Sequence, residues 1–290
     1  MSGTLYIVAT PIGNLSDISP RALDMLRQAS LIACEDTRTT GKLLARYSIQ
    51  TRTISYHEHN EKRRAIELVD KLLSGQDIAL VSDAGTPGIS DPGYRLVNEA
   101  RQNEVPIRTV PGPSAMLAAL AVSGLPISSF CFVGFLPVKP GARRKALDDV
   151  ASSPHTVVVF ESCRRAPGLL SELALRLGQR KAFVAREMTK IHEEHQYGTL
   201  PTLAEWARNS SLRGELTLVI SAPENGPSKA PGGLTQKDVA ARFLELTEQG
   251  LTRRQAVKKL AREQGRPSRQ IYDEVLSLQT SKPRGNDENS

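Results

Sequence analysis

The chain has 290 residues, of which 39% are hydrophobic, enough for about two domains with buried cores. Its cysteines, Cys34, Cys131 and Cys163, are odd in number and far apart, which argues against a disulfide framework and for a reducing, cytoplasmic compartment. No stretch has the length and apolarity of a bilayer-spanning helix, and the first residues lack the pattern of a targeting signal, so no membrane partner is expected. The formal net charge of +7 favours an anionic partner without requiring one.

The first part of the chain alternates short β-branched runs with amphipathic stretches. Strands are expected at 4–9, 31–35, 53–56, 77–82 and 106–110. Helices are expected at 20–29, 38–47, 61–74, 92–103 and 113–122. Strand followed by helix, repeated in this way, predicts an α/β domain over residues 1–122, with a mostly parallel sheet that has helices on both faces.

A second α/β domain is expected over residues 123–222, which begin with a linker-like stretch at 123–129. Strands are expected at 130–135, 156–161, 181–186, 193–198 and 215–221. Helices are expected near 142–151, 166–177 and 201–209. Because only some of these strands are separated by helices, the pattern indicates a mixed sheet.

A third unit follows a connector at 222–233 that is rich in proline, glycine and small polar residues. Thr235 and Thr252 stand where helix N-caps are expected, and Gln255 completes a capping box with Thr252. With a further helix starting near Pro267 and Ser268, residues 234–280 are predicted to form a small three-helix unit. Residues 281–290 are expected to be disordered.

The helical tail concentrates positive charge. Residues 250–272 contain Glu263 as their one acid and seven cations: Arg253, Arg254, Lys258, Lys259, Arg262, Arg266 and Arg269. Ala256, Val257, Leu260 and Ala261 recur at helical spacing, so the cations are expected on the opposite, exposed face. These cations are candidates for contacts with RNA phosphates. The alternative is an ordinary solvated helix face.

Three of the expected strand ends in the first domain are rich in small residues: 9–14, 82–90 and 111–115. Ligands of parallel α/β sheets bind beyond the carboxyl ends of the strands, and small residues let the backbone approach them closely. No G-x-G-x-x-G follows a strand, and Gly41-Lys42 is not part of a Walker A motif. We therefore expect a ligand that is not held by a phosphate-binding loop.

Several motifs in order, including "VATPIGNL", "CEDTRTTGKLL", "SDAGTPGISDPG", "VPGPSA", "FVGFLP" and "AREMTK", resemble the tetrapyrrole (corrin/porphyrin) methylases over residues 3–222. This resemblance implies a class III methyltransferase fold, with S-adenosyl-L-methionine in a cleft between two α/β domains, and a homodimer. The motifs are most similar to the branch that 2′-O-methylates a cytidine of 16S ribosomal RNA at the decoding centre of the small subunit.

Position by position, the resemblance implies a set of cofactor-binding residues: Ile12, Ala84, Gly85, Thr86, Ile89, Ser114, Ala115, Glu161 and Met188. The chain departs from the wider family in two loops. The first glycine-rich turn reads Ala-Thr-Pro-Ile-Gly at 9–13, and Thr86 replaces the acid of the family's Gly-Asp-Pro. Loss of that acid disfavours a tetrapyrrole substrate.

Methyl transfer from a sulfonium requires mainly that the acceptor oxygen be held close and in line, with a base as optional help. The candidates to contact the ribose or its proton are polar residues after the second and third strands and in "EMTK": Glu35, Asp36, Arg38, His57, Asn60 and Lys190. Asp36 has a simpler alternative role as a helix cap.

Other readings remain open at this point. The pairs His57/His59 and His192/His195 lack the spacing and the cysteines of a zinc site, so no metal is expected. The second functional hypothesis is a small-molecule, tetrapyrrole-like methylase of the same fold. The third is a non-catalytic RNA-binding assembly factor that retains the scaffold.

Overall fold

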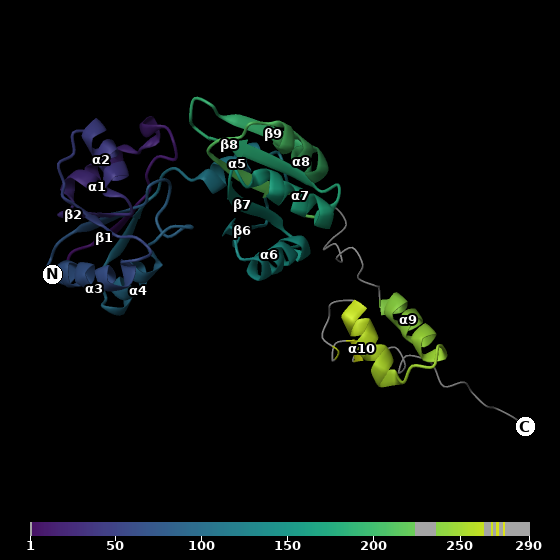
Figure 1. Ribbon diagram of the computed structural model, residues 1–290. Coiled ribbons are helices and arrows are strands. Elements are labelled where there is room, and N and C mark those ends of the chain that lie inside the picture. Colours follow the sequence, from purple (N-terminus) through teal and green to yellow (C-terminus); the bar gives the residue numbers. More distant parts are fainter. Residues whose placement is uncertain (1, 224–235, 264–267, 269–270, 273–274, 276–290) are drawn as a thin grey trace, which may run out of the picture. The chain divides into compact units, whose positions relative to one another are not determined.

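The structure is a computed structural model that describes residues 2–223, 236–263, 268, 271, 272 and 275. The chain divides into two compact units, with the division between residues 227 and 228. The first unit contains two α/β domains and the second contains the helical tail (Figure 1). None of the described helices is long and apolar enough to cross a membrane.

The first domain is built on a parallel sheet of β1 (Leu5–Val8), β2 (Leu31–Cys34), β3 (Thr53–Ser55), β4 (Ile78–Val81) and β5 (Ile107–Val110), in the order β3-β2-β4-β1-β5. A short 3-10 helix, η1 (Leu15–Asp17), follows β1. Helices α1 (Pro20–Gln28) and α2 (Thr37–Arg46) pack on one face. Helices α3 (Glu61–Leu73) and α4 (Tyr94–Gln102) pack on the other (Figure 1).

Local sequence explains these elements. Every residue of β2 and β4 is buried, as expected for central strands with helices on both faces. Ser19 caps α1 through a hydrogen bond from the Ala22 amide, and Pro20 occupies the first turn, where its missing N–H costs nothing. The strand and helix sequence predicted for this part of the chain is confirmed, with boundaries that differ by one or two residues.

The second domain is built on a mixed sheet of β6 (Phe130–Phe135), β7 (Thr156–Ser162), β8 (Lys181–Arg186), β9 (Glu194–Thr199) and β10 (Glu215–Ile220). Its order is β6-β7-β10-β8-β9, in which the β6/β7 pair is parallel and the other pairs are antiparallel. The mixed character predicted from the sequence is confirmed. Helices α6 (Pro140–Ser152), α7 (Ala166–Leu177) and α8 (Leu200–Asn209) form the core on one face.

The other face of the second sheet is covered by α5 (Ala115–Val122). Ala119 and Leu120 of this helix are buried against Val158, Phe183 and Val219 of the sheet. The sequence of α5, "AMLAALAV", has no polar side; the helix buries Ala119 and Leu120 against the sheet, whereas Leu117 and Val122 are exposed. The interval 1–122 expected as the first domain thus includes a helix that packs on the second sheet (Figure 1).

The second unit contains α9 (Gln236–Glu248) and α10 (Arg253–Glu263), and residues 268, 271, 272 and 275 are also helical. Phe243, Leu260 and Ile271 are among the side chains of its small core. The capping box is confirmed: the Thr252 amide donates to Gln255 Oε1 at 2.9 Å, and the Gln255 amide donates to Thr252 Oγ1 at 3.4 Å. Thr235, Pro267, residues 224–233 of the expected connector and the expected disordered segment 281–290 lie outside the described residues.

Candidate cofactor cavity and active site

A cavity of about 180 Å³ lies between the loops of the first domain and the second sheet. It is lined by loops that follow β1, β4 and β5, and by the ends of β6, β7, β8 and β10. Eight of the nine residues expected to bind the cofactor line it: Ile12, Ala84, Gly85, Thr86, Ile89, Ser114, Ala115 and Met188. The carboxyl ends of parallel strands therefore meet at this cavity, as the sequence predicts.

The loops after β1 and β4 are joined by their backbones. The Thr10 amide donates to the Gly85 carbonyl at 2.8 Å, and the Gly85 amide donates to the Thr10 carbonyl at 3.0 Å. Thr10 Oγ1 also donates to the Ser82 carbonyl at 3.0 Å. Gly85 has φ +82°, a conformation that favours glycine. This geometry explains why a glycine stands there.

The opposite wall is the turn at residues 187–190. A Cβ on Gly13 would lie 2.6 Å from Lys190 Cγ and 2.8 Å from Thr189 Oγ1, so the loop after β1 touches this turn closely. The Asn14 amide donates to Thr189 Oγ1 at 3.0 Å. Glu187 and Thr189 both have positive φ, at 50° and 66°, which is rare for residues other than glycine and clusters at functional sites.

Polar contacts hold this strained turn in place. Glu187 Oε1 accepts from Lys190 Nζ at 2.9 Å and from the Glu215 amide at 3.2 Å. Burial works to raise the pKa of Glu187, but the hydrogen bonds from Lys190 and from the Glu215 amide outweigh it and leave the pKa lowered. Glu187 is therefore ionised and paired with Lys190, and the cavity wall keeps one fixed ion pair.

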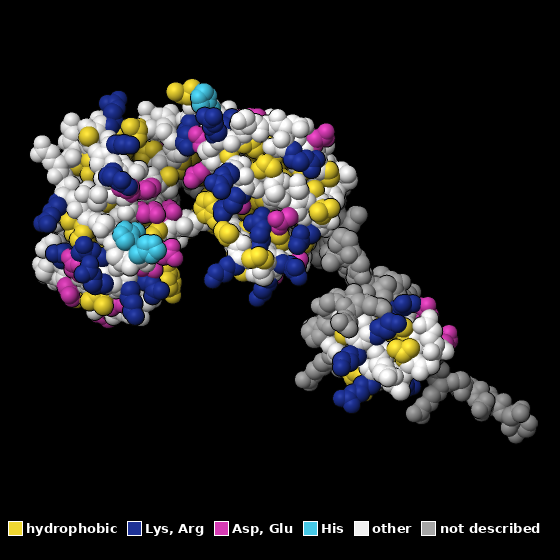
Figure 2. Space-filling model, viewed as in Figure 1, with side chains coloured by type: hydrophobic (Ala, Val, Ile, Leu, Met, Phe, Trp, Pro, Cys, Tyr) yellow, Lys and Arg dark blue, Asp and Glu magenta, His cyan; other side chains and the backbone are white. Residues whose placement is uncertain are grey.

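Carboxyl groups gather on the side of the cavity that the first domain provides. Burial, and then the charge of Glu35, raise the pKa of Asp91 to about 6. Burial and the charge of Asp83 raise the pKa of Glu35, and burial raises that of Asp83. Acidic side chains flank the hollow between the two domains (Figure 2). An environment of this kind suits a cationic ligand or a proton acceptor.

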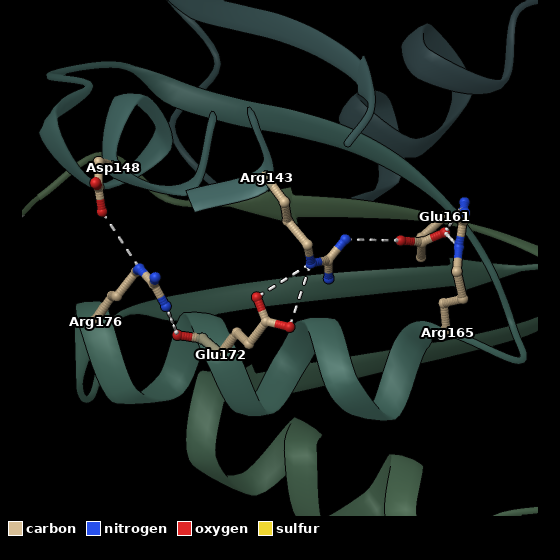
Figure 3. Close-up of polar contacts among 6 residues, drawn as sticks. All are labelled: Arg143, Asp148, Glu161, Arg165, Glu172 and Arg176. Carbon is tan, nitrogen blue, oxygen red and sulfur yellow. Dashed lines mark hydrogen bonds and ion pairs between the residues drawn. The ribbon is translucent and has the colours of Figure 1, made fainter. Parts of the chain in front are cut away.

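Glu161 is the expected cofactor residue that the structure does not bring to the cavity. Side chains alternate along β7, so Phe160 lines the cavity and Glu161 points to the opposite face of the sheet. Its carboxylate is fully buried there, where Oε1 accepts from Arg165 Nε at 2.6 Å and Oε2 lies 3.9 Å from Arg143 (Figure 3). The Glu161 side chain therefore does not line the cavity, and its role in cofactor binding stays a prediction.

Residues 4–204 match the family described as Tetrapyrrole (Corrin/Porphyrin) Methylases. The chain belongs to this family. The resemblance inferred from the motifs is confirmed, and so is the fold class.

Relatives within the family match nearly the whole chain. A protein of Synechocystis sp. named ribosomal RNA small subunit methyltransferase I is 44% identical, over 96% of this chain and 99% of its own length. A protein of the same name from Escherichia coli O157:H7 is 40% identical, over 96% of both chains.

Solved structures of other methyltransferases share the fold. Uroporphyrin-III-C-methyltransferase from Thermus thermophilus is 19% identical, with a TM-score of 0.54 over 77% of this chain and 93% of that chain. Another structure of a uroporphyrin-III C-methyltransferase from that organism, described as complexed with S-adenosyl homocysteine, is 20% identical, with a TM-score of 0.53 over 76% of this chain and 97% of that chain.

One of the six expected catalytic residues of this methylase, Lys190, lines the cavity. Glu35 lies close enough to Asp91 for its charge to affect the Asp91 pKa. His57 and Asn60 interact with each other after β3: the His57 amide donates to Asn60 Oδ1 at 2.9 Å, and Asn60 Nδ2 lies 3.1 Å from His57 Nε2. Neither of these two lines the cavity.

Asp36 and Arg38 form a local pair at the start of α2. Asp36 caps the helix by accepting from the Arg38 amide at 2.8 Å, and its other oxygen accepts from Arg38 Nη2 at 2.8 Å. These hydrogen bonds lower the pKa of Asp36 to about 2. The capping alternative is thus confirmed as a structural role, and neither side chain lines the cavity.

Sequence reasoning assigned no role to several further lining residues, among them Asp91, Glu187, Phe135 and Phe160. Asp91 follows the glycine-rich loop by one residue, which is the signal that could have indicated it. Within the described residues, no cluster of three or more His, Cys, Asp or Glu side chains is arranged to hold a metal. His195, for example, pairs with Glu193 at 2.9 Å.

Proposed function

We propose that the chain is an S-adenosyl-L-methionine-dependent methyltransferase that 2′-O-methylates the ribose of a cytidine in 16S ribosomal RNA, near the decoding centre of the small subunit. The observation that carries this proposal is the cavity, in which eight expected cofactor residues meet. Membership of the methylase family supports the reaction class, and relatives named for small-subunit ribosomal RNA support the substrate.

The residues of the cavity fit the cofactor. Its lining contains three carboxyl groups, Asp91, Glu187 and Glu215, against the single described cation Lys190, which Glu187 neutralises. Such a lining favours a ligand that carries a sulfonium and an ammonium group over a phosphate. Phe135, Phe160 and Met188 supply apolar walls for a purine ring. When bound, S-adenosyl-L-methionine supplies an electrophilic methyl group.

Asp91 is the residue best suited to receive the proton of the ribose hydroxyl. Its carboxyl lines the cavity, and with a pKa of about 6 it is ionised at neutral pH yet more basic than an ordinary aspartate. With S-adenosyl-L-methionine bound as the methyl donor, Asp91 would accept the proton that the ribose hydroxyl loses on methylation. The Lys190–Glu187 pair fixes the opposite wall during methylation.

The RNA partner is supported by the shape of α10. Ala256, Val257, Leu260 and Ala261 are buried in the core of the tail, whereas four expected RNA-binding cations are exposed: Arg253, Arg254, Lys258 and Lys259. This amphipathic arrangement leaves the cations available to phosphates. The side chain of Arg262, together with Arg266 and Arg269, lies outside the described residues. A small-molecule methylase has no need of this cationic face.

A second copy of the chain is the proposed partner in a homodimer, which acts in the cytoplasm. Strand β6 is the edge of the second sheet and carries apolar side chains that are exposed, among them Phe130, Val133 and Phe135. Val138 just beyond it is 72% exposed. Exposed apolar edges of this kind are characteristic of interaction surfaces. Light scattering in solution, with Val138→Asp as the disrupting variant, tests the dimer.

The function is tested by incubating the chain with methyl-labelled S-adenosyl-L-methionine and one of three acceptors. These are unmodified small ribosomal subunits, naked 16S ribosomal RNA and a uroporphyrin. We expect label at a single cytidine ribose of the RNA, mapped by primer extension. Label on the uroporphyrin would favour the small-molecule methylase. Cofactor binding without transfer to any acceptor would favour the non-catalytic assembly factor.

A further inference from the structure

Cationic side chains also gather on the second domain, around the first turns of α6 and the turn before α7. Figure 2 shows dark blue side chains over the part of this domain where Figure 1 labels α6. The segment "KPGARRK" at 139–145 carries four cations and no acid. The turn before α7 adds Arg164 and Arg165.

Ion pairs within the domain account for some of these cations. Arg143 is mostly buried and reaches Glu172 at 3.2 Å and Glu161 at 3.9 Å. Arg165 is held by the buried Glu161 (Figure 3). These contacts connect α6, β7 and α7, so Arg143 and Arg165 stabilise the domain.

The remaining cations form what we call the α6 patch: Lys139, Arg144, Lys145 and Arg164. All four are exposed. None of them forms a hydrogen bond or ion pair through its side chain with another described residue, in contrast to Arg143 and Arg165. Asp148 and Asp149 lie one turn further along α6, so the cations exceed the acids at the start of this helix and attract anions.

Two residues of the α6 patch, Lys139 and Arg164, follow cavity-lining strand ends closely in the chain. Strands β6 and β7 are parallel, so the segments that follow them leave the sheet at the same edge, where Phe135 and Phe160 line the cavity. Lys139 follows Phe135 by four residues and Arg164 follows Phe160 by four, which limits each Cα to about 14 Å from a lining residue. The Cys163 amide also donates to the Gly214 carbonyl at 2.9 Å, next to the lining residue Glu215.

We propose that Lys139, Arg144, Lys145 and Arg164 form a second RNA-contact surface, on the catalytic body itself, that binds backbone phosphates of the nucleotides flanking the methylated ribose. This inference rests on the proposed function. Guanidinium groups match the geometry of phosphate oxygens, and contacts on both sides of an acceptor nucleotide hold its ribose in line for transfer. The patch contains no aromatic platform, so its contacts are to the backbone and not to the bases.

The test compares two full-length variants that remove the same charge. The patch variant carries Lys139→Gln, Arg144→Gln, Lys145→Gln and Arg164→Gln. The control variant carries Lys42→Gln, Arg101→Gln, Arg108→Gln and Arg208→Gln, which change exposed cations on α2, α4, β5 and α8. Affinity for a 16S ribosomal RNA fragment containing the methylated nucleotide is measured across a salt series, together with methylation and cofactor affinity by calorimetry.

Each phosphate contact to single-stranded RNA contributes about 0.7 to the slope of log affinity against log salt, so loss of four lowers that slope by about 3. We expect this loss, together with slower methylation, in the patch variant alone, with cofactor affinity unchanged in both variants. Equal slopes in the two variants overturn the proposal. Slower methylation of subunits with an unchanged slope on the RNA fragment overturns it in favour of a contact with a ribosomal protein. Failure of the unaltered chain to methylate RNA rejects the proposed function itself.

Discussion

Thr10 and Gly85, 75 residues apart in the sequence, exchange two backbone hydrogen bonds of 2.8 and 3.0 Å at the wall of the cavity. These bonds make the loops after β1 and β4 a single rigid piece. A cavity wall formed in this way is organised before a ligand arrives, which lowers the entropy cost of binding.

Gly85→Ala is expected to weaken cofactor binding at least tenfold. The new Cβ meets no protein atom closer than 3.6 Å, so the effect comes from the backbone, whose φ of +82° costs alanine about 1 kcal/mol. Relaxing that strain moves the lining loop. Gly88→Ala is the matched control, because Gly88 has φ +83° and open space around it but does not line the cavity. Calorimetry showing equal cofactor affinity in the two variants would contradict the assignment of Gly85.

Asp91→Asn is expected to lower kcat about 100-fold, since the side chain keeps its shape and loses its basicity. In the unaltered chain kcat should rise with pH through about 6, where Asp91 ionises, and the variant should lack this limb. The measurement is a pH profile of single-turnover methylation. An unchanged kcat with weaker cofactor affinity would instead assign Asp91 to the positive groups of the cofactor.

The same variant makes a prediction about stability. The pKa of Asp91 is raised in the folded chain from 3.8 to about 6, so ionisation costs stability as pH rises through this range, and the cost is complete above it. Asp91→Asn should therefore be more stable than the unaltered chain at pH 8, by on the order of 1 kcal/mol, with no gain below pH 4. Urea unfolding at the two pH values measures this difference. A gain that is equal at both would show that the carboxyl charge is not its cause.

Glu161→Gln is expected to destabilise the chain by about 2 kcal/mol, because it removes the buried anion that holds Arg165, while Arg143 keeps Glu172. Arg176→Gln is the control, since its partner Asp148 is 64% exposed and such pairs contribute less than about 1 kcal/mol (Figure 3). Cofactor affinity of the folded Glu161→Gln chain should be unchanged. A tenfold loss of affinity without loss of stability would show that Glu161 is a cofactor residue.

The exposed face of α10 gives a prediction for the tail. Changing Arg253, Arg254, Lys258 and Lys259 to Gln keeps the buried face of the helix intact and should lower the salt slope of RNA binding by about 3. Cofactor affinity should not change. The four-cation control variant described for the α6 patch serves here as well. An unchanged slope would mean that α10 presents an ordinary solvated face.

The sequence by itself determined the order and type of the elements. Apolar runs such as "LIAC" and "IALV" are short and bounded by polar residues, so their local pattern suffices to predict buried parallel strands. The family's motifs, which mark positions in order, also led to nine expected cofactor residues, and eight of these line the cavity. The capping of α10 by Thr252 was likewise a local property.

Only the tertiary structure decided which side chains of these elements share one environment. The face to which Glu161 points depends on which side of β7 meets the cavity, and a shift of one residue along a strand reverses that answer. The raised pKa of Asp91 depends on burial and on Glu35, 56 positions away in the sequence. The position of α5 depends on which sheet has an apolar face that no other described helix covers, and this is the second sheet. Burial and electrostatic interactions act between residues that are distant in the chain, so no local pattern contains them.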